Sequence, residues 1–248
     1  MNRPAPYLLF LFDISPVLCR IILTGLFGWK NGKNRIRSID MAYRRVIASG
    51  ASEDRLERLI EERLKPGADK ELIDQRIWDL FGEEWCVMFT DLSGFSRGVA
   101  KFGIIHFLQT IYESERLLVP VIEDHDGILL KTEGDSFLII FRNVGKGIQC
   151  ALKMQEVLIE YNKDKVAEEK ILLCVGIGFG KMLRIGDSDV FGAEVNAASK
   201  LGEDTAEAWE ILVTGAVKNR CEMGNVEFVQ LEEAPPGADD AFRIVVKK

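Results

Sequence analysis

Short apolar runs alternate with longer amphipathic segments along the last two thirds of the chain, and this pattern restricts the fold more than any other feature. The runs have strand length and end at turn residues, whereas the longer segments repeat apolar residues at helical spacing. Predicted strands cover residues 85–90, 127–132, 135–141, 171–180 and 210–214, and predicted helices cover residues 96–119, 144–162 and 194–207. This alternation, with a hairpin that turns at Glu133 and Gly134, predicts an α+β sheet with helices on one face.

The composition favours a folded cytoplasmic protein. With 248 residues, of which 47% are hydrophobic and 29% charged, the chain is long enough for one or two domains with a substantial core. Its five cysteines are scattered without a Cys-x-x-Cys pair, which disfavours a disulfide framework and a zinc site and favours a reducing compartment. Residues 51–248 carry a net charge of −13, which argues against nucleic acid as a partner.

The N-terminal segment, residues 1–34, differs from the rest because it is apolar and basic. Residues 7–28 are mostly apolar but are interrupted by Asp13, Pro16 and Arg20, and a basic run follows them. Two interpretations remain open. The segment, with basic residues up to 37, either contacts or enters an anionic membrane, or it is an apolar helix packed on the body or on a second copy.

Residues 35–83 are predicted to be a helical connector or dimerisation element. Apolar residues recur at helical spacing over residues 52–64 and again over residues 69–81. Ser52 is placed to cap the first helix, and Gly82 ends the second.

The first motif places a carboxylate at the end of a strand. Asp91 follows the buried run, and Gly94, Phe95 and Ser96 then lead into a helix. In this arrangement Asp91 would hold a divalent cation, while the backbone N–H groups of the other three residues would receive phosphate oxygens. Asp is also common in caps and turns, so this segment alone favours a structural role.

The second motif lies at the tip of the predicted hairpin and contains Lys131 and Asp135. A Gly-Asp turn is by itself ordinary. If the first strand and the hairpin are neighbours in the sheet, however, Asp91 and Asp135 converge. Two close carboxylates repel unless a cation lies between them, so this pair predicts Mg²⁺ or Mn²⁺.

The third motif is a turn that contains Asp189 and opens a helix. Asn196 and Lys200 are four residues apart, so they share one face of that helix. On its own, this segment is typical of an ordinary capped helix with a solvated lysine.

Two other groups of residues are of types that can take part in chemistry. Gly176, Gly178 and Gly180 favour a close approach of backbone or ligand to a strand, because no helix follows where a dinucleotide loop needs one. His106 and His125 are isolated and favour structural roles.

Taken in order, the three motifs resemble the catalytic domain of class III nucleotidyl cyclases, the family of adenylate and guanylate cyclases, over about residues 85–220. The resemblance implies a ferredoxin-like catalytic domain over residues 84–248, with an antiparallel-rich sheet, after an N-terminal helical region. It also implies a site between two such domains, and therefore a head-to-tail homodimer.

The resemblance also implies a role for each matching residue. Asp91 and Asp135 correspond to the aspartates that bind two Mg²⁺ or Mn²⁺ ions per site. Lys131 and Asp189 correspond to the pair that reads the purine, and Lys with Asp is the adenine-type combination. Asn196 corresponds to the residue that orients the ribose.

The sequence departs from the family in two places. Lys200 stands where the family usually has an arginine that stabilises the transition state, and a lysine keeps the charge but loses the bidentate fork. Residues 232–240 are acidic, although the family often has a lysine-glycine segment there that contacts phosphate.

The resulting interpretation is a cytoplasmic adenylate cyclase that converts ATP to 3′,5′-cyclic AMP and pyrophosphate in signal transduction. Two alternatives stay open. One is a catalytically idle cyclase-like module that binds a nucleotide or a partner, and the other is a cyclase that uses a different nucleoside triphosphate.

Overall fold

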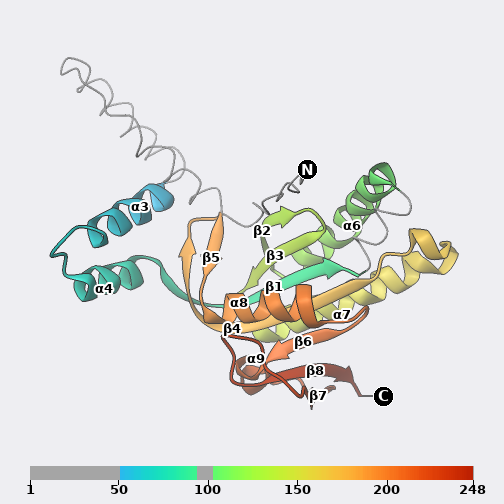
Figure 1. Ribbon diagram of the computed structural model, residues 1–248. Coiled ribbons are helices and arrows are strands. Elements are labelled where there is room, and N and C mark those ends of the chain that lie inside the picture. The colour runs from blue at the N-terminus through green and yellow to red at the C-terminus, as the bar shows by residue number, and fades with distance from the viewer. Residues whose placement is uncertain (1–50, 94–102, 248) are drawn as a thin grey trace, which may run out of the picture. The chain divides into compact units, whose positions relative to one another are not determined.

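The computed structural model describes residues 51–93 and 103–247 (Figure 1). The N-terminal segment predicted over residues 1–34 lies outside this part of the chain, as does the start of the helix predicted from residue 96. No helix in the described ranges is long and apolar enough to cross a membrane. The domain boundaries placed after residues 34 and 83 stay predictions.

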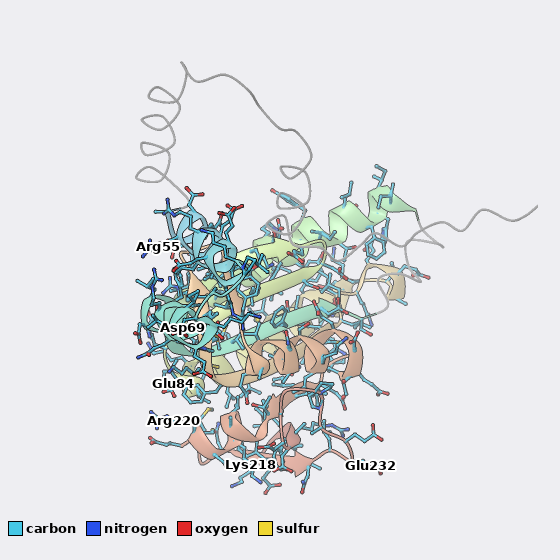
Figure 2. All side chains as sticks on the ribbon, turned by 60° about the vertical axis from the view of Figure 1, so that its left-hand side comes forward. Arg55, Asp69, Glu84, Lys218, Arg220 and Glu232 are labelled. Atoms are coloured by element: carbon cyan, nitrogen blue, oxygen red, sulfur yellow. The ribbon has the colours of Figure 1, made fainter. Side chains whose placement is uncertain are left out.

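The two helices predicted before the main domain are α3 (Ala51–Arg63) and α4 (Lys70–Phe81). Asp69, labelled in Figure 2, caps α4, since its side chain accepts a hydrogen bond of 3.0 Å from the backbone N–H of Leu72. The apolar faces of the two helices form a small core with the end of β4 (Leu173–Ile185); its buried members are Leu59, Ile73, Ile77, Phe81 and Ile185. The helical pair is therefore packed on the main domain.

The central unit follows the order strand, helix, two strands, helix, strand. Its elements are β1 (Gly82–Leu92), α6 (Ile104–Asp124), β2 (Ile128–Glu133), β3 (Ser136–Phe141), α7 (Val144–Tyr161) and β4 (Leu173–Ile185). The sheet order is β2-β3-β1-β4, and every neighbouring pair in this unit is antiparallel. This is the ferredoxin-like arrangement, so the expected fold class is confirmed.

The rest of the chain extends the sheet beyond β4. Its elements are β5 (Asp189–Phe191), α8 (Ala193–Ser199), the π-helix η3 (Lys200–Thr205), β6 (Ile211–Thr214), α9 (Gly215–Arg220), β7 (Val226–Gln230) and β8 (Ala241–Val246). β6 runs parallel to β4 and is followed by β8 and β7, while β5 pairs with β4. Among these elements, the sequence pattern predicts β6 and the helix at α8, but it does not predict β5, α9, β7 or β8.

Helices cover both faces of the sheet, so the expectation of helices on one face is wrong. The larger core lies between α6, α7 and one face of the strands, with Met88 and Ile139 among its buried members. The smaller core lies on the other face, where Val195 and Ala198 of α8 pack against Val87 and its neighbours. Figure 1 shows α8 and α7 on opposite sides of the strands.

The hairpin between β2 and β3 turns one residue later than predicted. Glu133 pairs with Ser136, so Gly134 and Asp135 form a two-residue turn. Gly134 has a φ of 61°, which the first position of such a turn requires and glycine adopts without strain. The turn therefore carries Asp135 at the tip of the hairpin.

Candidate active site

The ends of β1 and the β2–β3 hairpin bring Asp91 and Asp135 together. Thr90 of β1 pairs with Phe137 of β3, which places the next residue of β1 beside the hairpin tip. The hydroxyl of Ser136 lies 3.5 Å from Oδ1 of Asp91, and each aspartate affects the pKa of the other. The convergence that the sequence predicts for these two carboxyls is therefore present.

Burial and mutual repulsion disfavour the charged forms of these carboxyls. Burial, the negative charge of Asp135 and that of Glu203 raise the pKa of Asp91 to about 7. Burial also raises the pKa of Asp135, although hydrogen bonds partly oppose it. A cation between the two carboxylates would remove both the repulsion and part of the desolvation cost.

The donor set at this point fits a hard divalent cation. Oδ2 of Asp135 is buried and has no hydrogen-bond partner, which is the state of an oxygen placed to receive a cation. The described residues contain no group of three or more His, Cys, Asp and Glu side chains that could hold a metal. Mg²⁺ commonly uses one or two carboxylates and completes its shell with substrate phosphates and water, so two aspartates suffice.

Lys131 and Asp189 meet across the sheet although 58 residues separate them. Nζ of Lys131 lies 3.1 Å from Oδ2 of Asp189 and 2.8 Å from Oε1 of Glu133. Burial lowers the pKa of Lys131, but its hydrogen bonds to Glu133 and Asp189 outweigh burial, so the net pKa is raised. The structure thus holds one cationic donor and one anionic acceptor side by side, both partly buried.

Asn196 and Lys200 lie on the exposed surface of α8 and at the start of η3, respectively. Nζ of Lys200 lies 2.5 Å from Oδ2 of Asp204, one turn further along the chain. The two residues share an exposed face, as their spacing predicts. Gly94, Phe95 and Ser96, predicted to contact phosphate, lie outside the described residues.

The acidic C-terminal stretch forms the connection between β7 and β8. Glu232, labelled in Figure 2, is exposed at this edge of the molecule, near the end of the sheet remote from β2. Gly237 lies directly on the start of α8, where an added Cβ would come within 2.4 Å of the carbonyl oxygen of Ala193. The connection thus packs against the helix that carries Asn196.

The sequence pattern did not indicate a role for three acidic residues that lie near the candidate site residues. Glu203 acts on the pKa of Asp91, Glu133 pairs with Lys131, and Glu194 is turned inward from α8. Glu194 lies one helical turn before the buried Ala198, and a carboxylate on the buried face of a helix is a signal that could have identified it.

Known proteins resemble this chain over the region just described. A family model described as the adenylate and guanylate cyclase catalytic domain matches residues 82–236. An adenylate cyclase of Streptomyces coelicolor is 30% identical over 161 residues, which are 61% of this chain and 38% of that protein. The serine/threonine-protein kinase pkn2 of Myxococcus xanthus is 30% identical over 139 residues, which are 55% of this chain and 16% of the kinase.

The fold is also that of solved cyclase domains. The structure of the adenylyl cyclase CyaB from P. aeruginosa matches with a TM-score of 0.55 and 18% identity, over 67% of this chain and 96% of that chain. The chain spans less than two fifths of the curated relatives named above, so their whole-protein activities do not transfer to it. Because the family model matches well over half of the chain, including both converging aspartates and the Lys131–Asp189 pair, the chain belongs to the adenylate and guanylate cyclase catalytic domain family.

Proposed function

We propose that this protein is an adenylate cyclase, which converts ATP to 3′,5′-cyclic AMP and pyrophosphate. The observation that carries the proposal is the Lys131–Asp189 pair, held at 3.1 Å on the domain that also brings Asp91 and Asp135 together. An ammonium can donate to a ring nitrogen of adenine while a carboxylate accepts from the exocyclic amine. Guanine presents the opposite pattern at those positions, so the pair favours ATP.

In the proposed reaction, the ribose 3′-oxygen attacks the α-phosphorus and forms the new P–O bond. The bond from that phosphorus to the oxygen bridging to the β-phosphate breaks, pyrophosphate leaves, and the hydroxyl proton passes to solvent. Asp91 and Asp135 would hold Mg²⁺ or Mn²⁺, two ions per site. When bound, these ions would lower the pKa of the 3′-hydroxyl and neutralise charge on the triphosphate.

The remaining residues would position the substrate and stabilise charge. Asn196 would hold the ribose so that its 3′-oxygen faces the α-phosphorus. Lys200 would place its ammonium near the phosphate oxygens where charge accumulates in the transition state. For this role its ammonium must turn from Asp204 to the substrate, which an exposed ion pair allows because such a pair contributes little energy.

We further propose that the site forms between two copies of the chain. One copy would supply Asp91 and Asp135, and the other would supply Lys131, Asp189, Asn196 and Lys200. The exposure of Asn196 and Lys200 supports this arrangement, since groups that complete a partner's site must lie on the surface of their own chain.

The test is incubation of purified protein with each of the four nucleoside triphosphates and Mn²⁺, with products identified by mass. We expect cyclic AMP, with kcat/KM for ATP at least about tenfold above that for GTP, because a mismatched hydrogen-bond pair costs about 1–3 kcal/mol. Lys131→Glu should lower the use of ATP more than that of GTP. Equal turnover of the two nucleotides would overturn the base assignment.

A catalytically idle module is the second candidate, and the Lys200–Asp204 pair favours it. An ammonium held by its own chain at 2.5 Å is a weaker stabiliser of phosphate charge than a free arginine fork. An idle module would be stabilised thermally by ATP and Mn²⁺ yet would release no cyclic product.

A further inference from the structure

Glu194 is the second residue of α8, and its side chain points into the domain rather than toward solvent. Its Oε2 accepts two hydrogen bonds, one of 3.1 Å from the backbone N–H of Phe179 in β4 and one of 2.7 Å from the hydroxyl of Thr214 at the end of β6. Thr214 is fully buried. One carboxylate oxygen therefore connects the helix to two strands.

The bond to Phe179 replaces one that the sheet cannot make. The N–H of Val175 in β4 points toward β6 and donates to the carbonyl of Glu210. Because N–H groups alternate sides along a strand, those of Ile177 and Phe179 also point toward β6. The pairing ends at Ile177 with Val213, because α9 begins at Gly215. Glu194 thus supplies an acceptor for the N–H of Phe179, which lies beyond the last β4–β6 pair, and an unpaired N–H in this partly buried position would be costly.

The approach of α8 to β4 is close because β4 presents glycines to it. A Cβ added at Gly178 would lie 2.4 Å from the carbonyl oxygen of Glu194, and one added at Gly180 would lie 3.0 Å from its Cγ. At these two glycines no strand side chain separates the helix from β4. We therefore expect a change at Glu194 to shift the start of the helix relative to β4.

α8 has no side-chain cap at its start. It is seven residues long, its N-cap Gly192 offers no side-chain hydrogen bond, and so short a helix depends on tertiary contacts. Asn196 follows Glu194 by two residues and Lys200 by six, within the same continuous helical segment. An anchor at Glu194 fixes the rotation of this segment and hence the direction of both side chains.

We propose that Glu194 is a positioning residue, which ties α8 to β4 and β6 and thereby aims Asn196 and Lys200 at the nucleotide. This inference rests on the proposed cyclase function. Burial raises the pKa of Glu194, and the hydrogen bonds from Thr214 and Phe179 oppose that effect. These hydrogen bonds hold the carboxyl in place although its burial costs desolvation free energy.

The first test compares two substitutions that differ in their ability to accept hydrogen bonds. Glu194→Gln retains an oxygen that can accept both bonds, and it should keep kcat within about threefold of wild type. Glu194→Ala should lower kcat about 10- to 100-fold, because a shift of about 1 Å in a positioned group has effects of that size. KM for ATP should change less than about threefold, because the expected loss is mainly in the transition state.

Two further variants keep the first test interpretable. Thr214→Val removes only the hydroxyl and keeps the shape, so it should lower kcat about 2- to 10-fold even if Glu194→Ala fails to fold. Glu227→Ala removes an exposed carboxylate from β7 and serves as the matched control, with no change in kcat. Wild-type kcat in folded Glu194→Ala, or equal losses in the Gln and Ala variants, would overturn the proposal.

The second test determines whether Glu194 acts on the half of the shared site that contains Asn196 or on the half that contains Asp91. Glu194→Ala mixed with Asp91→Ala should recover activity, because one of the two sites in a mixed dimer is then free of both changes. Glu194→Ala mixed with Asn196→Ala should recover none, since both changes affect the same half.

The mixture of Asp91→Ala with Asn196→Ala separates the two proposals. If this reference pair recovers and Glu194→Ala with Asp91→Ala does not, the role of Glu194 is wrong. If the reference pair does not recover despite verified subunit exchange, the interfacial site is wrong, and the kcat comparison of the Gln and Ala variants then decides the role of Glu194 alone. A merely structural defect would lower the activity of every mixture that contains Glu194→Ala.

Discussion

Asp91, a proposed metal ligand, is a single residue whose burial lowers the stability of the folded chain at neutral pH. Its pKa is raised by burial, Asp135 and Glu203 to about 7, far above the ordinary value of 3.8. The folded chain thus holds a proton on Asp91 at pH values where the unfolded chain has released it. The contribution of Asp91 to the free energy of unfolding of the metal-free protein therefore falls as pH rises from about 4 to about 7.

The fall of stability with rising pH leads to a prediction about metal binding. Mn²⁺ competes with the proton, so it should raise the Tm of wild type more at pH 8 than at pH 5.5, as measured by thermal unfolding monitored by circular dichroism. Asp91→Asn should raise the Tm of the metal-free protein at pH 8 by at least about 2 °C, because about 1 kcal/mol shifts Tm by 2–4 °C at this size. It should also abolish the Mn²⁺ response. A response of equal size at both pH values would contradict the assignment of the pair as metal ligands.

Lys200 gives the second prediction at this scale. Lys200→Arg should preserve or raise kcat, because a guanidinium can contact two phosphate oxygens at once. Lys200→Ala should lower kcat with little change in KM for ATP, as measured by steady-state kinetics. Asp204→Asn is the matched control; it releases the ammonium from its ion pair and should not lower kcat. If Lys200→Ala has wild-type kcat, the family resemblance misleads at this position.

At the scale of elements, the glycines of β4 determine how closely α8 and η3 approach the sheet. At Gly176 a Cβ would lie 2.1 Å from the carbonyl oxygen of Ala198 and 2.3 Å from the backbone nitrogen of Gly202. Backbone atoms cannot rotate away as a side chain can. The sequence interpretation of these glycines as sites of close approach is thereby confirmed. The approaching group is the chain's own backbone at Gly176 and Gly178 and the side chain of Glu194 at Gly180.

This contact predicts a large effect of one methyl group. Gly176→Ala should lower the free energy of unfolding by about 2–4 kcal/mol, as measured by urea denaturation at pH 7.5. Gly224→Ala is the matched control, because nothing lies within 4 Å of its added Cβ, and its effect should stay within about 0.5 kcal/mol. A nearly neutral Gly176→Ala would mean that α8 and η3 can move away from the sheet without cost.

The elements also show what the sequence could and could not predict. Periodicity identified α3, α4, α7 and the buried strands, because long patterned segments carry a clear signal. β5 was missed because it has three residues, and β7 and β8 because their sequences alternate weakly. The convergence of Asp91 with Asp135 required only neighbouring strands, whereas the role of Glu194 depends on where β6 stops, which no local pattern records.

At the scale of the whole molecule, the proposed site is divided between two chains, and activity then depends on association. The proposed metal ligands lie at the end of β1 and on the β2–β3 hairpin, whereas Asn196 and Lys200 lie on the outer face of α8 and η3. A monomer would hold each set without its complement. Its activity should therefore be near zero rather than half that of the dimer.

The last prediction is that cyclic AMP formed per chain rises with protein concentration and then reaches a plateau. Half of the plateau should occur near the concentration at which half of the chains are dimeric, because folded dimers form by mass action. Product should be measured over a thousandfold dilution with carrier protein to prevent adsorption, and the monomer–dimer equilibrium should be measured separately by analytical ultracentrifugation under the same conditions. Saturating ATP and Mn²⁺ should shift both curves together to lower concentration, since a ligand held by two chains favours their association. Constant product per chain across a range where sedimentation shows monomers would place the complete site within one chain.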